Sequence, residues 1–459
     1  MSVVVQEQPP HRPTGARIAQ RAGLAFGTVA LAVSIAGFLA LALSSRPAPP
    51  LTLAVAAGIA GLAVLALALA RFDAAVALGM LIFGFVLVEP APPDAVLAIA
   101  IAVALVTGRF SLRAVPMPIL GLIGAFLVLN LLSAMFALDP ARAGSYFLIT
   151  LYLTVFAVWI AGYVDSFQRA ATIVRPLVAG AVVSAALGVA ALFVAFPGNG
   201  LLNPGPTDRR AHGFFEDANV FGPFLVVPAV LVLGELLEPR FLRSGRLVKA
   251  AMLSALGLGI LFAYSRAGWL NAALAILVML IVYSLRRGGG GKAFALLLTL
   301  VAMLAVTSTV LAATGSVDFL RERAQLQSYD ANRFAGQERG IGLVRDYPLG
   351  IGPGQFEQTV GIASHSTYVR ALGEQGLLGL AAVLGLMLGT LVLGARNAIL
   401  GYDSFGIGSA PLLAAWFGIA ANSAFVDTLH WRHLWLVAAL IWAGSLRQTS
   451  FDPWRVAMR

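Results

Sequence analysis

Long apolar runs alternate with short polar segments along almost the whole chain. A helix needs about 20 consecutive apolar residues to cross a bilayer. Fourteen runs reach or approach that length, at 23–43, 51–70, 74–88, 95–106, 119–136, 144–164, 173–196, 219–237, 247–264, 267–285, 293–313, 377–395, 410–426 and 433–446. Three of them are short, so twelve spans is the alternative count. The pattern predicts an all-α polytopic integral membrane protein with 12–14 transmembrane helices in a single domain at 23–446.

Composition supports this class. The 459 residues are 59% hydrophobic and only 11% charged, whereas soluble domains carry about 25% charged residues. There is no cysteine, which excludes disulfides and thiolate chemistry. The net charge is +10, but the basic residues do not form a cluster with interleaved aromatic residues. Nucleic acid is therefore not an expected partner. We assign the charge to contacts with anionic membrane lipids and an anionic substrate.

The distribution of Arg and Lys predicts the orientation. With a cytoplasmic N-terminal tail at 1–22 and alternating helices, 19 of the 31 basic residues fall on the cytoplasmic side, as the positive-inside rule requires. The C-terminal tail at 447–459 is then also cytoplasmic. Two longer segments, 197–218 and 314–376, face the other side, and we expect the second to carry short helices.

The unusual polar residues of the chain all fall on that second side. "DRRAHGFFEDANVFGPFL" begins at Asp208, "YSRAG" places Ser265 and Arg266 between two apolar runs, and the long loop supplies Arg333. Several arginines converging at a membrane boundary call for an anion. The fork of Arg266 suits a phosphate oxygen pair, and interfacial snorkelling is the alternative. For Arg333 the alternative is a solvated loop arginine.

"GIGPGQFEQTVGIASHSTYV" contains a Gly/Pro turn, with Gly352 and Gly354, and ends near His365. The turn predicts a bend that brings backbone close to a ligand, or simply shapes the loop. Ser366 is placed to cap the next helix, with Tyr368 following it. His365 is the side chain near these arginines best suited to act as a general base at neutral pH, and a solvated loop histidine is the alternative.

Two other polar groups lie on this side. "DTLHWRH" spaces Asp427, His430 and His433 three residues apart, which on one helical face could bind a metal, although the flanking tryptophans favour an interfacial aromatic belt. Glu216, Asp217 and Asn219 have no second acidic cluster beside them. We therefore expect hydrogen-bonding and helix-start roles there, with Asp217 or Asn219 near the cap.

Four of these motifs together resemble the O-antigen ligase and polymerase superfamily. "HSTYVRALGEQGLLGL" resembles its histidine signature, "PLGIGPGQF" the turn before it, "YSRAG" its Ser-Arg junction, and "FFEDANVFGPFL" the segment that enters a spanning helix. The resemblance covers about 205–395. Ser366 stands where the superfamily usually has Asn, and Ala218 where it usually has Pro.

The resemblance implies a glycosyltransferase of the bacterial inner membrane with its site facing the periplasm. It implies transfer of a glycan from undecaprenyl diphosphate to a hydroxyl with inversion, without a metal or cofactor. Catalysis falls to His365. The implied donor and substrate contacts are Arg266, Arg333, Arg210, Ser265, Asn219, Asp217, Gly352, Gly354 and Tyr368.

The acceptor stays open at this point. We expect an O-antigen ligase acting on lipid A–core, with a polymerase that uses a second lipid-linked glycan as the alternative. A polytopic transporter is the alternative from another class. It is disfavoured because the helix interiors are nearly free of charge, whereas transporters place ionisable or broken helices near the bilayer midplane.

Overall fold

The computed structural model describes residues 51–202, 208–286, 288–325 and 328–445. The predicted helix at 23–43 and the two predicted tails, 1–22 and 447–459, lie outside these residues. Within the described ranges the chain is helical and forms no β-strand, apart from isolated bridges at Val86–Phe215 and Ser404–Ile407. The all-α class of a polytopic membrane protein is therefore confirmed.

The helices follow the predicted apolar runs closely, because run length and hydrophobicity determine where a membrane helix forms. In chain order the elements are α2 (Leu51–Ala70), α3 (Phe72–Leu81), α4 (Pro92–Val106), η1 (Leu112–Ala114), α5 (Met117–Ala134), α6 (Pro140–Tyr163), α7 (Phe167–Phe193), α8 (Asn199–Leu202), α9 (Ala218–Leu237), α10 (Arg246–Phe262), α11 (Arg266–Leu285), α12 (Gly290–Ala313), α13 (Val317–Ala324), α14 (Ser328–Asp346), α15 (Phe356–Val360), α16 (Thr367–Leu400), α17 (Ser409–Asn422) and α18 (Arg432–Ser445).

Seven of the described helices are long and apolar enough to cross a membrane unaided, namely α5, α6, α7, α9, α11, α12 and α16. The expected count of 12–14 also included shorter apolar runs. Four of these form helices of 10, 15, 14 and 14 residues, α3, α4, α17 and α18, which are shorter than the roughly 20 residues of a full span. They pack among the longer helices.

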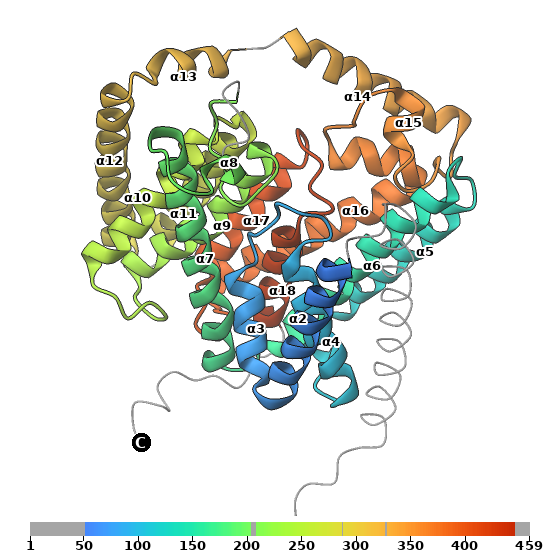
Figure 1. Ribbon diagram of the computed structural model, residues 1–459, viewed down its shortest axis with the longest axis horizontal. Helices are drawn as coiled ribbons and strands as arrows, with labels where there is room; N and C mark the ends of the chain where they lie inside the picture. The colour runs from blue at the N-terminus through green and yellow to red at the C-terminus, as the bar shows by residue number, and fades with distance from the viewer. Residues whose placement is uncertain (1–50, 203–207, 287, 326–327, 446–459) are drawn as a thin grey trace, which may run out of the picture.

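The segment 314–376, predicted as a long loop that carries short helices, is mostly helical. It contains α13, α14 and α15, and α14 has 19 residues. It also contains the start of α16, which begins ten residues before the predicted apolar run. Gly376 breaks the helical geometry there with φ 70° and ψ −167°, so a short polar helix precedes the membrane helix. In Figure 1, α13 and α14 cross one end of the bundle from α12 to α15 and α16.

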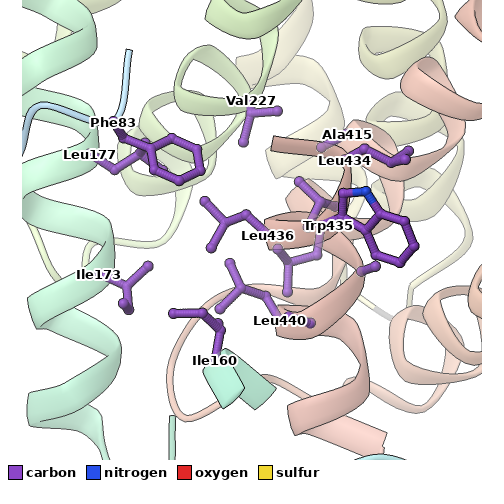
Figure 2. Packing of buried hydrophobic residues seen from close by; sticks show 14 of the residues in the cluster. Phe83, Ile160, Ile173, Leu177, Val227, Ala415, Leu434, Trp435, Leu436 and Leu440 are labelled. Atoms are coloured by element: carbon purple, nitrogen blue, oxygen red, sulfur yellow. The ribbon is translucent and has the colours of Figure 1, made fainter. Parts of the chain in front are cut away.

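The core is built around α18, whose residues from His433 to Ser445 are all buried. Figure 2 shows Leu436 and Leu440 of α18 directed toward Ile160 of α6 and Ile173 of α7. By contrast, α12 lies at the periphery and exposes a stripe of large apolar side chains, including Val301 and Leu304. A helix that is apolar on an exposed face requires lipid as its solvent.

Backbone hydrogen bonds fix the Gly/Pro turn after α14 against α16. Ile351 N donates to Gly373 O (3.0 Å), and Gly352 N donates to Glu374 O (3.0 Å). Gly350 has φ +87°, and a Cβ atom at that position would lie 2.2 Å from Glu374 O. Only glycine fits this approach, because both the backbone conformation and the space exclude a side chain.

We therefore expect Gly350→Ala to destabilise the protein by more than about 1–3 kcal/mol, the usual cost of a strained backbone, since a backbone clash adds to it. The matched control is Gly342→Ala on the exposed face of α14, where a Cβ meets no atom within 4 Å. That change should be neutral or stabilise by up to about 1 kcal/mol. Thermal unfolding of both variants in detergent tests this, and equal melting temperatures would contradict it.

Candidate functional site

Several helix ends meet at the end of the bundle that α13 and α14 cross (Figure 1). Ala211 N, just before α9, donates to Phe262 O at the end of α10 (2.7 Å). Thr367 N, at the start of α16, donates to Ser423 O at the end of α17 (2.8 Å). These bonds hold segments that are far apart in the sequence beside one another, and they bring most of the predicted site residues to this end.

His365 lies two residues before α16 in a constrained backbone. Its φ of +47° is uncommon for a residue other than glycine, although histidine tolerates it better than most. The Gln337 side-chain amide of α14 donates to Ser364 O (3.2 Å) and His365 O (3.4 Å). Ser366 caps α16 as predicted, since its Oγ accepts from Val369 N (3.3 Å). The backbone that carries the half-buried imidazole is thus held by its neighbours, as is common where strain serves function.

Arg266 and Arg333 converge on one carboxylate. Arg266, the first residue of α11, donates from its two terminal nitrogens to both oxygens of Asp330 (2.8 and 2.7 Å). Arg333, one turn further along α14, lies 3.9 Å from Asp330 Oδ1. The side chain of Asp330 is only 10% exposed. Two guanidiniums from different helices therefore surround a single anionic group in a largely desolvated position.

Electrostatics link His365 to this pair. Burial lowers the pKa of His365 below its usual 6.5, and the positive charge of Arg333 lowers it further, against the opposing effect of Glu357, Asp217 and Asp427. The imidazole is therefore neutral at pH 7, the form that accepts a proton.

Arg210 forms a separate ion pair just before α9. Its guanidinium bonds both oxygens of Asp208 (2.8 Å each), and His212 Nε2 lies 2.9 Å from the same carboxylate. Burial opposes ionisation of Asp208, but the hydrogen bonds from Arg210 and His212 outweigh it and lower the pKa of Asp208 to about 2. The adjacent Ala211 places this pair beside the end of α10, close to the start of α11.

Four of the predicted contact residues hold the helix ends in place. Ser265 is fully buried and caps α11, because its Oγ accepts from Gly268 N (3.2 Å). Asp217 caps α9 and bonds both the backbone and the side chain of Asn219 (2.8 and 3.0 Å). Tyr368 Oη donates to Ala420 O (2.7 Å). The helix-start role expected for Asp217 is confirmed.

The Gly/Pro turn packs closely against other parts of the chain. A Cβ at Gly352 would lie 2.7 Å from Ala137, and one at Gly354 would lie 2.6 Å from the Tyr146 ring. Both glycines have positive φ, of 97° and 73°. Their small size lets the turn pack against Ala137, between α5 and α6, and against Tyr146 of α6, as the loop-shaping alternative expects.

The expectation that Asp427, His430 and His433 share one helical face is wrong. Residues 427–431 are not helical, and α18 begins only at Arg432. His430 lies 3.1 Å from Thr150 Oγ1, and His433 stacks on Trp431. Among the described residues, no group of three or more His, Asp or Glu side chains is arranged to hold a metal ion.

A buried charge network was missed from the sequence. Arg370 pairs with Glu374 one turn along α16 (3.0 Å) and with Asp427 in the connection to α18, and it lies over the Tyr146 ring at 4.8 Å. The i, i+4 spacing of Arg370 and Glu374 is the sequence signal that could have revealed half of it. Asp427 is separated by 57 residues, so nothing local indicated that contact.

Two guanidiniums and a neutral imidazole, gathered at one end of an apolar bundle, can bind an anion and accept a proton beside it. The fold and the site together define a multi-pass membrane protein with a polar site at the ends of its helices.

Residues 250–384 match a family model described as O-Antigen ligase. This segment includes Ser265, Arg266, Asp330, Arg333 and His365, and it confirms the resemblance to the O-antigen ligase and polymerase superfamily. The domain implies a glycosyltransferase-like activity. No curated protein matches the chain.

Because Arg333 contributes to the low pKa of His365, we expect Arg333→Gln to raise it, so that the imidazole of the variant titrates at a higher pH. Arg339→Gln is the matched control, since Arg339 donates to Val360 O and is not among the charges that shift His365. NMR titration of isotope-labelled histidines measures both. A downward shift in Arg333→Gln, or equal shifts in the two variants, would contradict the assignment.

Proposed function

We propose that this protein transfers a glycan from an undecaprenyl-diphosphate carrier to a hydroxyl acceptor at the periplasmic face of the bacterial inner membrane. Its closest functional description is an O-antigen ligase that acts on lipid A–core. The family domain supports the glycosyltransferase class. The excess of basic residues on the opposite side supports the periplasmic orientation of 197–218 and 314–376.

The convergence of Arg266 and Arg333 on Asp330 carries the proposal. A guanidinium recognises a carboxylate and a phosphate through the same pair of parallel hydrogen bonds. In this proposal, one phosphoryl group of the donor binds the two arginines in the same way as the Asp330 carboxylate. The donor must displace Asp330 or share the guanidiniums with it, and Arg210 in its own pair with Asp208 is available to the second phosphate after a similar exchange.

Helix orientation assists anion binding. α9, α11 and α16 all begin at this end of the bundle, so the positive ends of their dipoles face the site. Caps from Asp217, Ser265 and Ser366 fix these starts. The arginines and helix ends together neutralise the diphosphate without a metal ion, which is why we propose a metal-independent reaction.

His365 acts as the general base in this scheme. Its neutral imidazole takes the proton of the acceptor hydroxyl while that oxygen attacks the anomeric carbon. The bond between the anomeric carbon and the diphosphate oxygen breaks on the opposite face of the sugar, so the configuration inverts. Negative charge develops on the leaving diphosphate, where Arg266 and Arg333 stabilise it. The polyprenyl tail stays against the apolar helices.

Loss of the base should reduce kcat far more than donor affinity. We expect His365→Asn to lower kcat by about 10²–10⁴-fold, with an unchanged melting temperature, because asparagine also tolerates the positive φ at this position. Arg266→Lys should weaken transfer by about tenfold or more, since an ammonium cannot form the bidentate contact.

Transfer of a labelled lipid-linked glycan by the purified variants measures both effects. Arg321→Lys, on α13 with a side chain that is 74% exposed, is the matched control for the arginine change. Near-normal turnover by a folded His365→Asn variant would remove the general-base role.

The acceptor can be identified from the glycans of a deletion strain. A ligase admits a bulky lipid acceptor, whereas a polymerase binds two lipid-linked glycans. Without a ligase, polymerised glycans should accumulate on undecaprenyl diphosphate and none should reach lipid A–core. Without a polymerase, lipid A–core should still receive a single repeat unit. Analysis of both lipid pools distinguishes the two, and the single-repeat pattern would favour a polymerase.

A further inference from the structure

A cavity of about 210 Å³ lies beside the proposed site, where the loop between α3 and α4, the start of α9 and the start of α18 meet. The loops at its mouth are joined, because Val86 N donates to Phe214 O (2.7 Å). Asp217 lines the cavity and also acts electrostatically on His365. The cavity and the proposed base therefore share a neighbour.

The inner wall is aromatic. Phe83, Phe215, Phe224 and Trp431 line it, and each is less than a tenth exposed. The His433 ring also lines the cavity and stacks on Trp431, with ring centroids 5.0 Å apart. His433 is 3% exposed, and its Nε2 has no hydrogen-bond partner within the described part of the chain. A buried polar atom without a partner calls for a ligand or water that supplies the missing bond.

The mouth of the cavity is acidic. Glu89, Glu216 and Asp217 line it together with one guanidinium, Arg432, which is paired with Asp94 and lies 3.7 Å from Glu89. Burial raises the pKa of Glu89 and Arg432 opposes this, while the charges of Asp94 and Glu216 add to the rise. This crowding of carboxylates repels an anion. The diphosphate that Arg266 and Arg333 attract is thus excluded from the cavity.

We propose that this cavity is a subsite for one uncharged, hydroxyl-rich sugar ring of a lipid-linked substrate. Carboxylates accept hydrogen bonds from sugar hydroxyls, and an aromatic face packs against the apolar face of the ring. The cavity volume fits a single sugar ring, because it is smaller than the roughly 300–1,000 Å³ of cavities that bind drug-sized ligands. The inference rests on the proposed function in taking the sugar to belong to the donor or the acceptor.

The direct test is binding of free sugars to the full-length protein in lipid nanodiscs, which avoids sugar-headed detergents. The probes are the methyl glycosides of glucose, galactose and N-acetylglucosamine, with methyl glucuronide as the anionic counterpart. Saturation-transfer NMR should detect at least one neutral glycoside and should detect methyl glucuronide far more weakly, because the acidic mouth repels it.

Two variants locate the binding. Val220→Phe adds a ring to a residue that lines the cavity and should abolish the signal, whereas Val183→Phe on the exposed face of α7 should not. Glu216→Gln should weaken binding about tenfold, as expected for a lost charged hydrogen bond, while Glu338→Gln on the exposed face of α14 leaves it unchanged. The proposal is overturned if no neutral glycoside binds, if Val220→Phe keeps the signal, or if methyl glucuronide binds equally well.

The test of sugar binding in the cavity can be distinguished from the test of glycan transfer. His365→Asn and Arg266→Lys should reduce transfer but keep glycoside binding, because neither residue lines the cavity. Binding in a protein that shows no transfer would leave the subsite standing and remove the proposed reaction. In an active protein, a higher KM of Val220→Phe for the acceptor assigns the subsite to the acceptor sugar, and a higher KM for the donor assigns it to the donor sugar.

Discussion

Hydrocarbon cannot solvate charge, and this constraint determines where chemistry can occur in the chain. A charged side chain in a spanning segment needs a partner or water, so ionisable residues collect at helix ends. Here one such group lies where α9, α11 and α16 begin. The same constraint keeps the backbone helical through the membrane, because every amide must be satisfied internally. The irregular backbone around His365 is possible only because neighbouring helices supply its hydrogen bonds.

The Arg370 network illustrates how the polar end is held together. Arg370 is almost completely buried and meets Glu374 on its own helix and Asp427 in the segment before α18. Removing one member of such a group would leave an uncompensated buried charge, which is strongly destabilising. The network therefore ties the start of α16, which begins two residues after His365, to the segment that leads into α18. We regard it as support for the site rather than part of the chemistry.

The sequence could predict the positions of the described apolar helices, because hydrophobic length alone determines them. It could also predict that Ser366 and Asp217 cap helices, since capping is local. The pairing of Arg266 with Asp330 could not be predicted, because 64 residues separate them and no periodicity connects them. The apolar run by itself does not show where α16 begins, although Ser366 marks the cap. Its first turns are polar and pack on α14, so the apolar run begins only after the break at Gly376.

Groups of opposite charge act on His365, and they belong to two different environments. Arg266 and Arg333 form a basic position that a carboxylate occupies, whereas the cavity lined by Asp217 has an acidic mouth and aromatic walls. A lipid-linked glycan is itself divided into an anionic diphosphate and neutral sugars. Under the proposed function, the two environments would orient such a molecule by charge, with the diphosphate at the arginines and a sugar in the cavity.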